Sequence, residues 1–599
     1  MLTAKSIASP SPGVYVYDFG QNMSGVPRLR VKGRRGDDIK LRFAEVLNPD
    51  GSMYVENLRT AKATDHFILA GGRDGGVEEY QPQFTFHGFR YIEISGLIAK
   101  PDLDTVKAVV FHTDAPFTTK FETGDSMVNQ LWSNIQWGQR SNFIGVPTDC
   151  PQRDERLGWT ADAQVFWRTA AYNMELNSFT RKFSGDLRGT QVGTSMYGIF
   201  APGTNSPNPG YGAGWSDAGV IIPWTGWIQT GNMRTVEENW DAMEKYLARI
   251  HELNPDFLWR NGYGAAFGDW LTPTQTTPED LIATAYWAYD ASLMEDMAIA
   301  SGRTAKAEEY GALFNNIKVA FNKAYVRSDG FVGAIDSYPS IPPPTIAPEP
   351  EGASKAKAVV ETQTGYVLAL YMKLLPDQLR APAAQKLIQK IKDNHWLLGT
   401  GFLGTPYLLE VLSDTGHSDV AYRLLLNKDY PSWGYLIEHG ATTTWERWNG
   451  DQMRGDPSMN SYNHYAYGAV AEWMYRYAAG IDASTTDPGF HTIYLHPNFD
   501  SRLGHLNFSY ESTYGTVVSN WKVQGADVEW NVTVPANSRA RLPIDASNAA
   551  SFTLDGLPLS KSNKVHLDGG GFYILPAGSY SFKAVIKDRV VDMANNRLH

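Results

Sequence analysis

Hydrophobic and polar residues alternate along the first part of the chain. Residues 14–20, 27–33, 38–47 and 89–96 alternate or run apolar between turns rich in Gly, Asn and Asp. This pattern predicts strands, and we expect residues 1–118 to form an N-terminal β-sandwich domain. The basic cluster RLRVKGRR (28–35) alternates like a strand, which indicates one solvated face of that strand.

From about residue 119 to residue 481 the apolar period becomes helical. Residues 239–254, 280–302, 307–326 and 362–375 place apolar side chains at three-and-four spacing over at least two turns. Loops rich in Gly, Pro and Asp separate these segments. The pattern predicts successive helices in a closed array, but periodicity by itself does not specify a barrel.

Strand-like alternation returns near residue 482, after the linker-like sequence ASTTDPG. Residues 491–497, 516–523, 527–535 and 571–586 read as strands. We therefore expect a C-terminal β-sandwich over residues 482–599. The chain is predicted to be a multidomain α and β protein with domains 1–118, 119–481 and 482–599.

Length and composition agree with this organisation. A chain of 599 residues is usually divided into two to four domains. Aromatic residues make up 13%, with 18 Trp and 31 Tyr, which fits sugar-stacking surfaces, although core packing can absorb most of them. The net charge of −11 argues against a nucleic-acid partner, which needs a basic surface.

Cysteine usage and the N-terminal sequence narrow the setting. The single cysteine, Cys150, excludes an intrachain disulfide and a cysteine-based metal site. Because the nearest histidine along the chain, His112, gives no sign of a nucleophile's partner, we interpret Cys150 as a packing residue. The first residues lack an apolar signal region and no run is long enough to span a bilayer, so we expect a cytoplasmic protein without a membrane partner.

The segment PTDCPQRDERLGWTADAQVFWR (147–168) concentrates acidic, basic and indole groups. Glu155, Trp159 and Asp162 fall at i, i+4 and i+7, which would place them on one face of a helix begun by Pro151 and capped by Asp149. Carboxylates beside an apolar ring suit an enzyme that binds a sugar and raises the pKa of one acid. The alternative is a solvated, salt-bridged helix start with Trp159 packed inward.

Two later segments complete a set of three motifs. GATTTWERW (440–448) contains Glu446, and SYNHYAYGAVAEWMYRY (461–477) contains His464. In their order and approximate spacing, the three segments closely resemble the bacterial α-L-rhamnosidases of glycoside hydrolase family 78. The resemblance covers most of the chain and is weakest at the two ends.

The resemblance implies a fold and a set of roles. It implies an (α/α)6 barrel as the catalytic domain, flanked by N- and C-terminal β-sandwich, jelly-roll-like domains. It implies an inverting hydrolase that releases terminal non-reducing α-L-rhamnose, with carboxyl groups roughly 6.5–9.5 Å apart. Glu155 would be the general acid, Glu446 would be the general base, and the sugar would contact Asp149, Arg153, Trp159, Asp162 and His464. Standing alone, His464 would be interpreted as a satisfied core histidine.

Three aromatic loops between the predicted helices add candidate pocket walls. Residues 210–224, 261–273 and 431–448 combine glycine with Trp and Asp, as ligand-binding loops often do. The resemblance implies that Trp215, Asp269 and Trp270 line the pocket; Trp270 could equally be a buried anchor of its own loop. The Pro-rich segment 337–352 is predicted to be extended, as a rim loop or a lid.

The residues around Glu155 would influence its protonation in both directions. Asp149 and Asp162 would raise the pKa of Glu155, with Trp159 limiting its solvation, whereas Arg153 and Arg156 would lower it. The sequence does not determine whether the pKa of Glu155 is raised or lowered.

No grouping of His, Asp and Glu has clear ligand spacing, and glycoside hydrolysis needs no metal. We therefore expect no metal and no cofactor.

Other functions remain alternatives. One is a different inverting enzyme on the same barrel, such as a glucosidase, a trehalase or a disaccharide phosphorylase. The others are a non-catalytic rhamnoside-binding relative and a polysaccharide lyase. The expected partners are small rhamnosylated glycosides or oligosaccharides. The oligomeric state stays open, a homodimer being the commonest arrangement of soluble enzymes.

Overall fold

The computed structural model describes two compact units, each assembled from segments that lie far apart in the sequence. The first unit comprises residues 1–114, 130–158 and 435–468, and the second comprises residues 115–129, 159–434 and 469–599. The described residues are 1–72, 76–204, 209–265, 267–337, 358–455, 459–543, 552–585 and 590–591.

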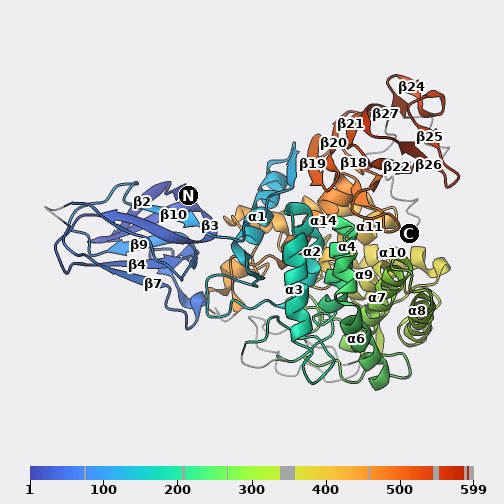
Figure 1. Ribbon diagram of the computed structural model, residues 1–599, viewed down its shortest axis with the longest axis horizontal. Coiled ribbons are helices and arrows are strands. Elements are labelled where there is room, and N and C mark those ends of the chain that lie inside the picture. Colours follow the sequence, from blue (N-terminus) through green and yellow to red (C-terminus); the bar gives the residue numbers. More distant parts are fainter. Residues whose placement is uncertain are drawn as a thin grey trace. The chain divides into compact units, whose positions relative to one another are not determined.

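The first unit contains a large antiparallel sheet near the N-terminus (Figure 1). The described strands follow the order β1-β10-β3-β9-β4-β7, and β2 and β8 also pair with β3. Their bounds are β1 (Leu2–Thr3), β2 (Ser6–Ser11), β3 (Val14–Val31), β4 (Asp38–Ala44), β7 (Thr64–Ile68), β8 (Glu78–Tyr80), β9 (His87–Ser95) and β10 (Val106–Val110).

One long strand joins this sheet together. The segments 14–20 and 27–33 were predicted as separate strands, but residues 14–31 form the single 18-residue strand β3. A register shift against β9 between Asp18 and Met23 marks the irregularity within it. Near its end Arg28 and Arg30 are exposed, whereas Leu29 and Val31 are buried, so the predicted solvated basic face is confirmed.

The inward side chains of β3, β4, β9 and β10 share one apolar core, in which Phe43 and Phe89 meet with ring centroids 5.2 Å apart. The rest of the first unit consists of short elements and irregular chain. These elements are β5 (Val46–Leu47), β6 (Met53–Tyr54), η1 (Glu56–Leu58), α1 (Ser126–Asn142) as it continues into this unit, β12 (Phe143–Ile144), β13 (Val146–Pro147), α13 (Trp433–Glu438) as it enters this unit, and η3 (Gly450–Gly455).

The second unit is built around a ring of helices. Among the described residues, six helical segments each pack against the next, and the last packs against the first. All residues of the first ring helix and nearly all of the fourth are buried, which is the pattern of helices enclosed on every side. The ring segments are α2 (Thr160–Asn173), α4 (Ala218–Thr230), α7 (Glu279–Ala300), α9 (Gln363–Tyr371), α11 (Thr405–Asp414) and α14 (Ala471–Trp473), with the last preceded by η5 (Ala466–Val470) and continued by the π-helical turn η6 (Met474–Ala478).

A second set of helices packs outside the ring (Figure 1). Such a helix buries one face only; α6, for example, buries Trp240, Met243, Leu247 and Ile250 at three-and-four spacing. The predicted helical array is therefore a double ring, and the (α/α)6 barrel is confirmed. The other helices of this unit are α3 (Asn177–Gly189), α5 (Arg234–Glu237), α6 (Trp240–Leu253), α8 (Thr304–Tyr325), α10 (Asp377–Asp393) and α12 (Ser418–Leu425). Within the part of the chain described here, no helix has the length and apolarity required to cross a membrane.

The C-terminal strands form two sheets in the second unit. In the described residues a seven-stranded sheet has the order β11-β19-β20-β21-β27-β23-β24 and a five-stranded sheet the order β16-β17-β22-β26-β25. Four short pairs of described strands lie apart from them: β14 with β15, β18 with β28 and, in the first unit, β5 with β6 and β12 with β13. The bounds are β11 (Thr119–Thr123), β14 (Ala334–Ser337), β15 (Ala358–Val360), β16 (Ile481–Ala483), β17 (Thr492–Leu495), β18 (Phe499–Asp500), β19 (His505–Ser512), β20 (Gly515–Gln524), β21 (Asp527–Val534), β22 (Arg539–Pro543), β23 (Thr553–Leu554), β24 (Leu557–Pro558), η7 (Leu559–Lys561), β25 (His566–Leu567), β26 (Phe572–Leu575), β27 (Gly578–Val585) and β28 (Val590–Val591).

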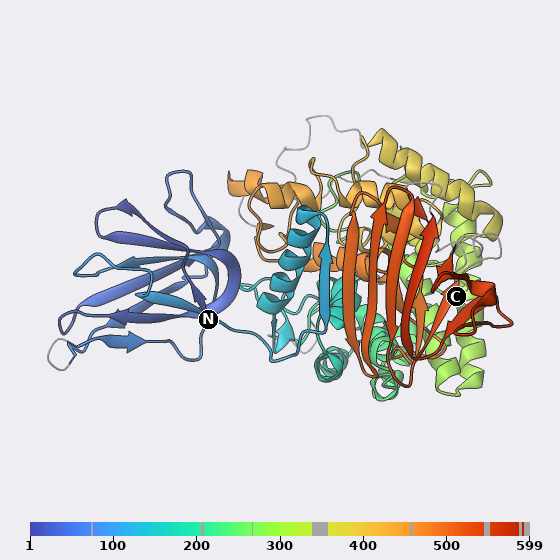
Figure 2. The same ribbon diagram turned by 90° about the horizontal axis from the view of Figure 1, so that it is seen from above.

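Strand β11 was not predicted, and it pairs with a strand from the other end of the chain. Figure 2 shows this light-blue strand at the edge of the orange and red sheet, where Phe121 is the register partner of Phe508. The strands predicted at 516–523 and 527–535 correspond to β20 and β21. The domain boundaries after residues 118 and 481 stay predictions. Beyond Ser337, the Pro-rich segment proposed as a rim loop or lid lies outside the described residues.

Candidate active site

The acidic motif is an irregular loop that precedes a helix. Helix α2 begins at Thr160, so Glu155 and Trp159 lie before it, and the predicted single helical face is wrong. Arg156 has φ 52°, a left-handed conformation that an α-helix does not accommodate. Nor does Asp149 cap a helix. It closes the loop instead: its N–H donates to Leu157 O (2.9 Å), and its Oδ1 accepts from Leu157 N–H (3.0 Å).

In the first unit, Arg153 connects the two predicted catalytic carboxylates. Its Nε donates to Glu155 Oε2 at 2.9 Å, and its Nη1 donates to Glu446 Oε2 at 3.0 Å, although Arg153 and Glu446 are 293 positions apart in the sequence. Nη2 lies 2.8 Å from Glu155 Oε2 and 3.4 Å from Glu446 Oε1. The two glutamates thus occupy two different edges of one planar guanidinium. Because the side chain of Arg153 is only 1% exposed, its charge is weakly screened by solvent.

Glu446 lies in an irregular segment that is fixed by its backbone. Its N–H donates to Ser461 O and its Oε2 accepts from Ser461 N–H, both at 2.9 Å. Burial alone would raise the pKa of Glu446, but Arg153, His464 and the Ser461 N–H outweigh burial and lower the pKa to about 2. The carboxylate is therefore ionised throughout the neutral range, as a general base requires.

Asp149 is a buried carboxyl group with the opposite tendency. Burial raises its pKa to about 7, and the charge of Glu155 adds to this rise against the opposing charges of Arg153 and His464. Next to it, Cys150 Sγ donates to Asp149 Oδ2 at 2.7 Å. Burial raises the pKa of the Cys150 thiol well above its ordinary value, so the group stays protonated and is a poor nucleophile.

A second cation, Arg59, contacts Glu155 from residues 1–114 of the first unit, which are called the N-terminal sheet domain from this point on. Arg59 follows η1, and its guanidinium lies 3.0 Å from Glu155 Oε2 and 2.7 Å from Asp154 Oδ1. Arg156, which was expected to influence Glu155, instead donates to the carbonyl oxygens of Pro151 and Phe86. Arg59 was missed because no motif spacing links residue 59 to the acidic loop.

His464 comes close to the same loop. Its backbone N–H donates to Thr444 O at 2.8 Å, and its side chain is buried. Among the described residues, Asp149, Cys150 and His464 bring possible metal-ligand atoms within 4.8 Å of one another, a grouping that sequence spacing did not reveal. The protonated thiol and Arg153, 3.8 Å from Asp149, both disfavour a cation at this position.

In the second unit, the predicted tryptophans gather around one phenylalanine. Trp159, Trp215 and Trp270 precede α2, α4 and α7, respectively. Their ring centroids lie 5.8, 4.7 and 6.0 Å from that of Phe267. Trp215 is 3% exposed, whereas Trp159 and Trp270 are half-buried. Phe267 was not predicted as a site residue, although it lies in the loop 261–273, which was predicted to be a pocket wall.

The two aspartates predicted in this unit have different surroundings. Asp162 is buried in the first turn of α2, at the positive end of the helix dipole. Asp269 is buried and accepts four hydrogen bonds, which come from Thr364 Oγ1 (2.5 Å) and from the N–H groups of Gly401 (2.7 Å), Leu403 (2.8 Å) and Gly404 (3.1 Å). Asp269 thus fixes the loop before α11, and its contact with a sugar stays a prediction.

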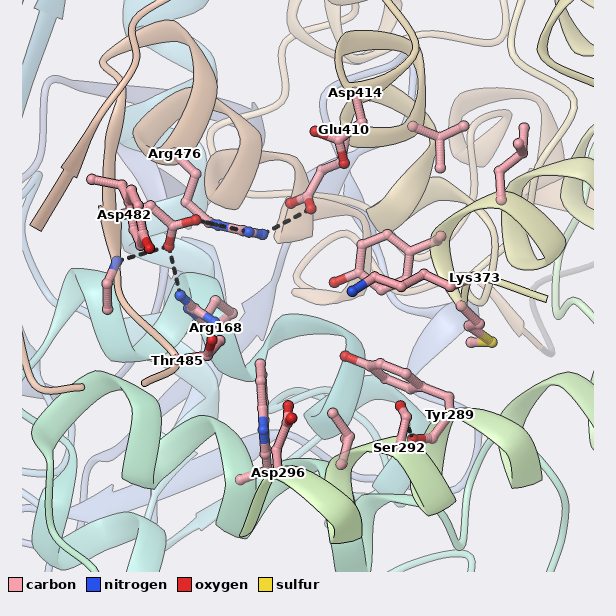
Figure 3. A pocket seen from close by; sticks show the side chains of 18 of the residues that line it. Arg168, Tyr289, Ser292, Asp296, Lys373, Glu410, Asp414, Arg476, Asp482 and Thr485 are labelled. Carbon is pink, nitrogen blue, oxygen red and sulfur yellow. Dashed lines mark hydrogen bonds and ion pairs between the residues drawn. The ribbon is translucent and has the colours of Figure 1, made fainter. Parts of the chain in front are cut away.

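A cavity of about 420 Å³ lies elsewhere in the second unit, along the C-terminal halves of the ring helices (Figure 3). Its wall includes a buried charge network, in which Arg476 pairs with Glu410 (2.8 Å) and Asp482 (3.0 Å), and Arg168 pairs with Asp482 (2.8 Å). The predicted tryptophans of this unit precede the ring helices instead. None of the ten predicted site residues lines this cavity.

Comparison with known families gives three adjoining matches. Residues 8–112 match the bacterial alpha-L-rhamnosidase concanavalin-like domain, and residues 116–478 match the bacterial alpha-L-rhamnosidase 6 hairpin glycosidase domain. Residues 480–554 match the bacterial alpha-L-rhamnosidase C-terminal domain.

Individual relatives agree with these matches. An alpha-L-rhamnosidase of Streptomyces avermitilis is 44% identical over 91% of this chain and 50% of its own length, and one of Formosa agariphila is 38% identical over 95% and 60%. The crystal structure of the Streptomyces avermitilis alpha-L-rhamnosidase complexed with L-rhamnose has a TM-score of 0.86 at 41% identity, covering 97% of this chain and 53% of that one. The alpha-L-rhamnosidase structure from Dictyoglumus thermophilum has a TM-score of 0.85 at 32% identity, covering 98% and 63%. The chain thus spans between half and two thirds of the length of these relatives.

Proposed function

The chain belongs to the bacterial α-L-rhamnosidase family, and from this premise we propose that it hydrolyses terminal α-L-rhamnosides with inversion of configuration. The observation that carries the proposal is the arrangement at Arg153, which holds Glu155 and Glu446 on two edges of one guanidinium. Paired carboxyl groups with different environments are what glycoside hydrolysis requires.

Glu155 is proposed as the general acid. Cleavage of a glycosidic bond develops oxocarbenium character, so the departing oxygen needs a proton from a nearby acid. Both arginine contacts, from Arg153 at 2.8 Å and from Arg59 at 3.0 Å, fall on Glu155 Oε2. These contacts fix the position of the Glu155 carboxyl group, from which the proton would be delivered to the departing oxygen.

Glu446 is proposed as the general base. With its pKa lowered to about 2 by Arg153 against the effect of burial, it is ready to accept a proton from water. Inversion needs carboxyl groups roughly 6.5–9.5 Å apart, so that a water molecule fits on the far side of the sugar. A guanidinium inserted between Glu155 and Glu446 acts as a spacer, which supports inversion over direct attack by a carboxylate.

The sugar itself offers a methyl group and C–H faces that pack well against aromatic rings. In the second unit, Trp159, Trp215 and Trp270 surround Phe267 and supply such rings. We propose small rhamnosylated glycosides or oligosaccharides as substrates, which agrees with the L-rhamnose bound to the Streptomyces avermitilis relative.

The proposal is tested by the release of p-nitrophenol from its α-L-rhamnopyranoside and its α-D-glucopyranoside. The rhamnoside should be strongly preferred, and Glu155→Gln and Glu446→Gln should each lower kcat by about 10²- to 10⁴-fold. Glu252→Gln, at a residue whose carboxylate pairs with Arg249 on the surface, is the matched control and should retain activity. Near-normal turnover by Glu155→Gln or Glu446→Gln would remove that residue from its proposed role.

The same assay separates the alternatives. A disaccharide phosphorylase would depend on phosphate, and a lyase would release an unsaturated product that absorbs in the ultraviolet. A binding relative would retain measurable affinity for L-rhamnose without turnover. Rhamnoside hydrolysis without added phosphate and without an absorbing product would exclude these functions.

A further inference from the structure

Glu45 is a buried acid that the hydrolytic mechanism does not use. It lies between β4 and β5, in the apolar run Phe43–Leu47, and it is 2% exposed. Its carboxylate accepts hydrogen bonds from Asn22 Nδ2 (2.9 Å), Asn57 Nδ2 (3.0 Å) and Tyr462 N–H (3.2 Å). Burying a carboxyl group in a sheet domain is unfavourable unless such bonds compensate, so this position would be better filled by an apolar residue if it served packing alone.

Each of the three partners of Glu45 either belongs to the segment 460–462 or donates a hydrogen bond to it. Tyr462 donates to Glu45 directly. Asn57 Nδ2 also donates to Asn460 O (3.2 Å), and Asn22 Nδ2 also donates to Tyr462 O (3.3 Å). Glu45 therefore orients two amide side chains that bind both ends of this short stretch of backbone.

The residue in the middle of that stretch serves Glu446. The Ser461 N–H donates to Glu446 Oε2, and the Ser461 carbonyl accepts from the Glu446 N–H, both at 2.9 Å. The Tyr462 carbonyl additionally accepts from Thr443 Oγ1 at 2.6 Å. A displacement of residues 460–462 would thus move one of the groups that fix the Glu446 carboxylate opposite Arg153.

The neighbouring strand β3 also holds the segment that precedes Glu446 in the sequence. The Asn22 N–H donates to Thr442 Oγ1 (2.9 Å), and Gln21 Nε2 donates to Thr442 O (2.7 Å). Residues on both sides of Glu446 in the sequence are therefore held by polar groups of the N-terminal sheet domain.

We propose that Glu45 is a positioning residue for Glu446: it orders residues 460–462 so that the Ser461 N–H and Arg153 hold the Glu446 carboxylate in its basic, catalytic geometry. This inference rests on the proposed function, because it assumes that Glu446 is the general base. It assigns to the N-terminal sheet domain a direct part in arranging the catalytic pair.

The electrostatic setting of Glu45 is consistent with such a role. Burial raises its pKa to about 7, against the lowering effects of Asn22, Tyr462, Arg153 and Asn57. Arg90, Tyr91 and His439 line the same cavity of about 310 Å³ as Glu45. An ionised Glu45 accepts from all three donors, whereas protonation would turn one accepting oxygen into a donor.

The first test compares Glu45→Gln with Glu93→Gln, using p-nitrophenyl α-L-rhamnopyranoside as the substrate. Glu93 lies on β9 in the same sheet and pairs with Arg42, so the control carries the same chemical change away from residues 460–462. Glu45→Gln should lower kcat by about 10- to 100-fold with little change in KM, because the substitution misplaces the base Glu446 but leaves the contacts with the sugar intact. The acidic limb of its kcat/KM profile should move to higher pH, because Glu446 loses part of the support that lowers its pKa.

A second variant and a second measurement protect the test against simple misfolding. Asn57→Ser removes the bonds to Glu45 and Asn460 but leaves the Glu45 carboxyl group, and it should shift kcat and the acidic limb in the same direction by a smaller factor. Hydrogen–deuterium exchange of residues 459–465 should be faster in Glu45→Gln than in the wild type or in Glu93→Gln.

The outcomes separate this inference from the proposed function. A Glu45→Gln enzyme that melts earlier but keeps the wild-type kcat and acidic limb would overturn the positioning role. If the wild-type protein hydrolyses no rhamnoside, the proposed function fails. The exchange measurement then tests only whether Glu45 orders residues 460–462. Unchanged exchange in residues 459–465 would then overturn the anchoring by Glu45, and faster exchange would support it.

Discussion

At the scale of single residues, the proposed chemistry depends on Arg153. One buried guanidinium lies within 4 Å of three carboxyl groups, those of Asp149, Glu155 and Glu446. Without it, these buried groups would repel one another and favour protonation. The cation thus keeps the Glu446 carboxylate ionised, as the base proposed above requires.

Replacement of Arg153 by lysine should separate charge from geometry. Lysine keeps the charge but has no planar fork for two carboxylates, so kcat/KM should fall by at least about 100-fold. The pKa of Glu446 should rise from about 2, because its main cationic support is weakened, and the acidic limb of the pH–rate profile should move upward. The measurement is kcat/KM for the rhamnoside between pH 4 and pH 9.

Arg181→Lys is the matched control for this prediction. Arg181 also binds a carboxylate through two nitrogens, those of Glu238, but this pair lies on the surface of the second unit. The Arg181→Lys substitution should leave the pH–rate profile unchanged. An Arg153→Lys enzyme with the profile of this control would contradict the role given to the guanidinium.

Asp149 should make stability depend on pH in a defined direction. Its pKa is raised by burial from 3.8 to about 7, so the folded state binds the proton more tightly than the unfolded state. This contribution is complete below the unfolded value and is lost as pH rises toward the folded value. Relative to Asp149→Asn, which does not titrate, the wild type should therefore lose stability between about pH 4 and pH 7 and change no further above that range.

Thermal unfolding of both proteins at several pH values provides the measurement. The difference in midpoint between the wild type and Asp149→Asn should become less favourable to the wild type as pH rises through this range. Two midpoints that move in parallel would show that Asp149 titrates normally.

At the scale of helices, strands and loops, the sequence predicted regular elements better than the acidic loop. The segment 239–254 corresponds to α6 and the segment 527–535 to β21, because each buries one face with a clear period. The spacing of Glu155 and Trp159 also fits a helix, but tertiary contacts override it. The left-handed Arg156 and the pairing of Asp149 with Leu157 keep this stretch in a loop.

The loop that carries Phe267 should determine affinity for the sugar. Phe267→Ala removes the ring against which Trp159, Trp215 and Trp270 pack. Each such aromatic contact is worth about 0.5–1.5 kcal/mol, so KM should rise by about tenfold while kcat changes less. Phe84→Ala, at a fully exposed phenylalanine of the first unit, is the control. An unchanged KM would contradict a sugar-binding role for the cluster.

Asp269 should matter for stability as well as for any contact with substrate. Asparagine at this position would present an amide N–H₂ group to donors that now meet a carboxylate oxygen. Asp269→Asn should therefore destabilise the protein by about 1–3 kcal/mol, which denaturant unfolding would measure. Asp256→Asn, an exposed control 3.9 Å from Arg260, should unfold like the wild type. A KM that changes without any loss of stability would instead favour a role in sugar binding alone.

At the scale of the whole chain, the sequence could not supply the long-range pairings. Periodicity predicted helices between residues 119 and 481, but the closing contact of α14 with α2 involves the two ends of that span. Strand β11 likewise joins β19 at the opposite end of the chain, and a short strand of five residues offers little pattern of its own.

The sequence also could not predict which distant residues contact the candidate catalytic motifs. Motif resemblance predicted roles for Glu155 and Glu446, whereas Glu45 and Arg59 became candidates only because the fold brings them next to the motifs. An acid in the apolar run Phe43–Leu47 was a signal for Glu45 that the sequence did contain, since an acid seldom interrupts such a run without a partner. For Arg59 no comparable signal exists.

The most direct test of the central claim is a ¹H NMR measurement of the first sugar released from p-nitrophenyl α-L-rhamnopyranoside. If Glu155 donates a proton while Glu446 activates water across the Arg153 spacer, β-L-rhamnose should appear first and mutarotate afterwards. Glu446→Gln should release almost no sugar within the same minutes. Initial release of α-L-rhamnose would contradict the account, because it would require a carboxylate to attack the sugar directly.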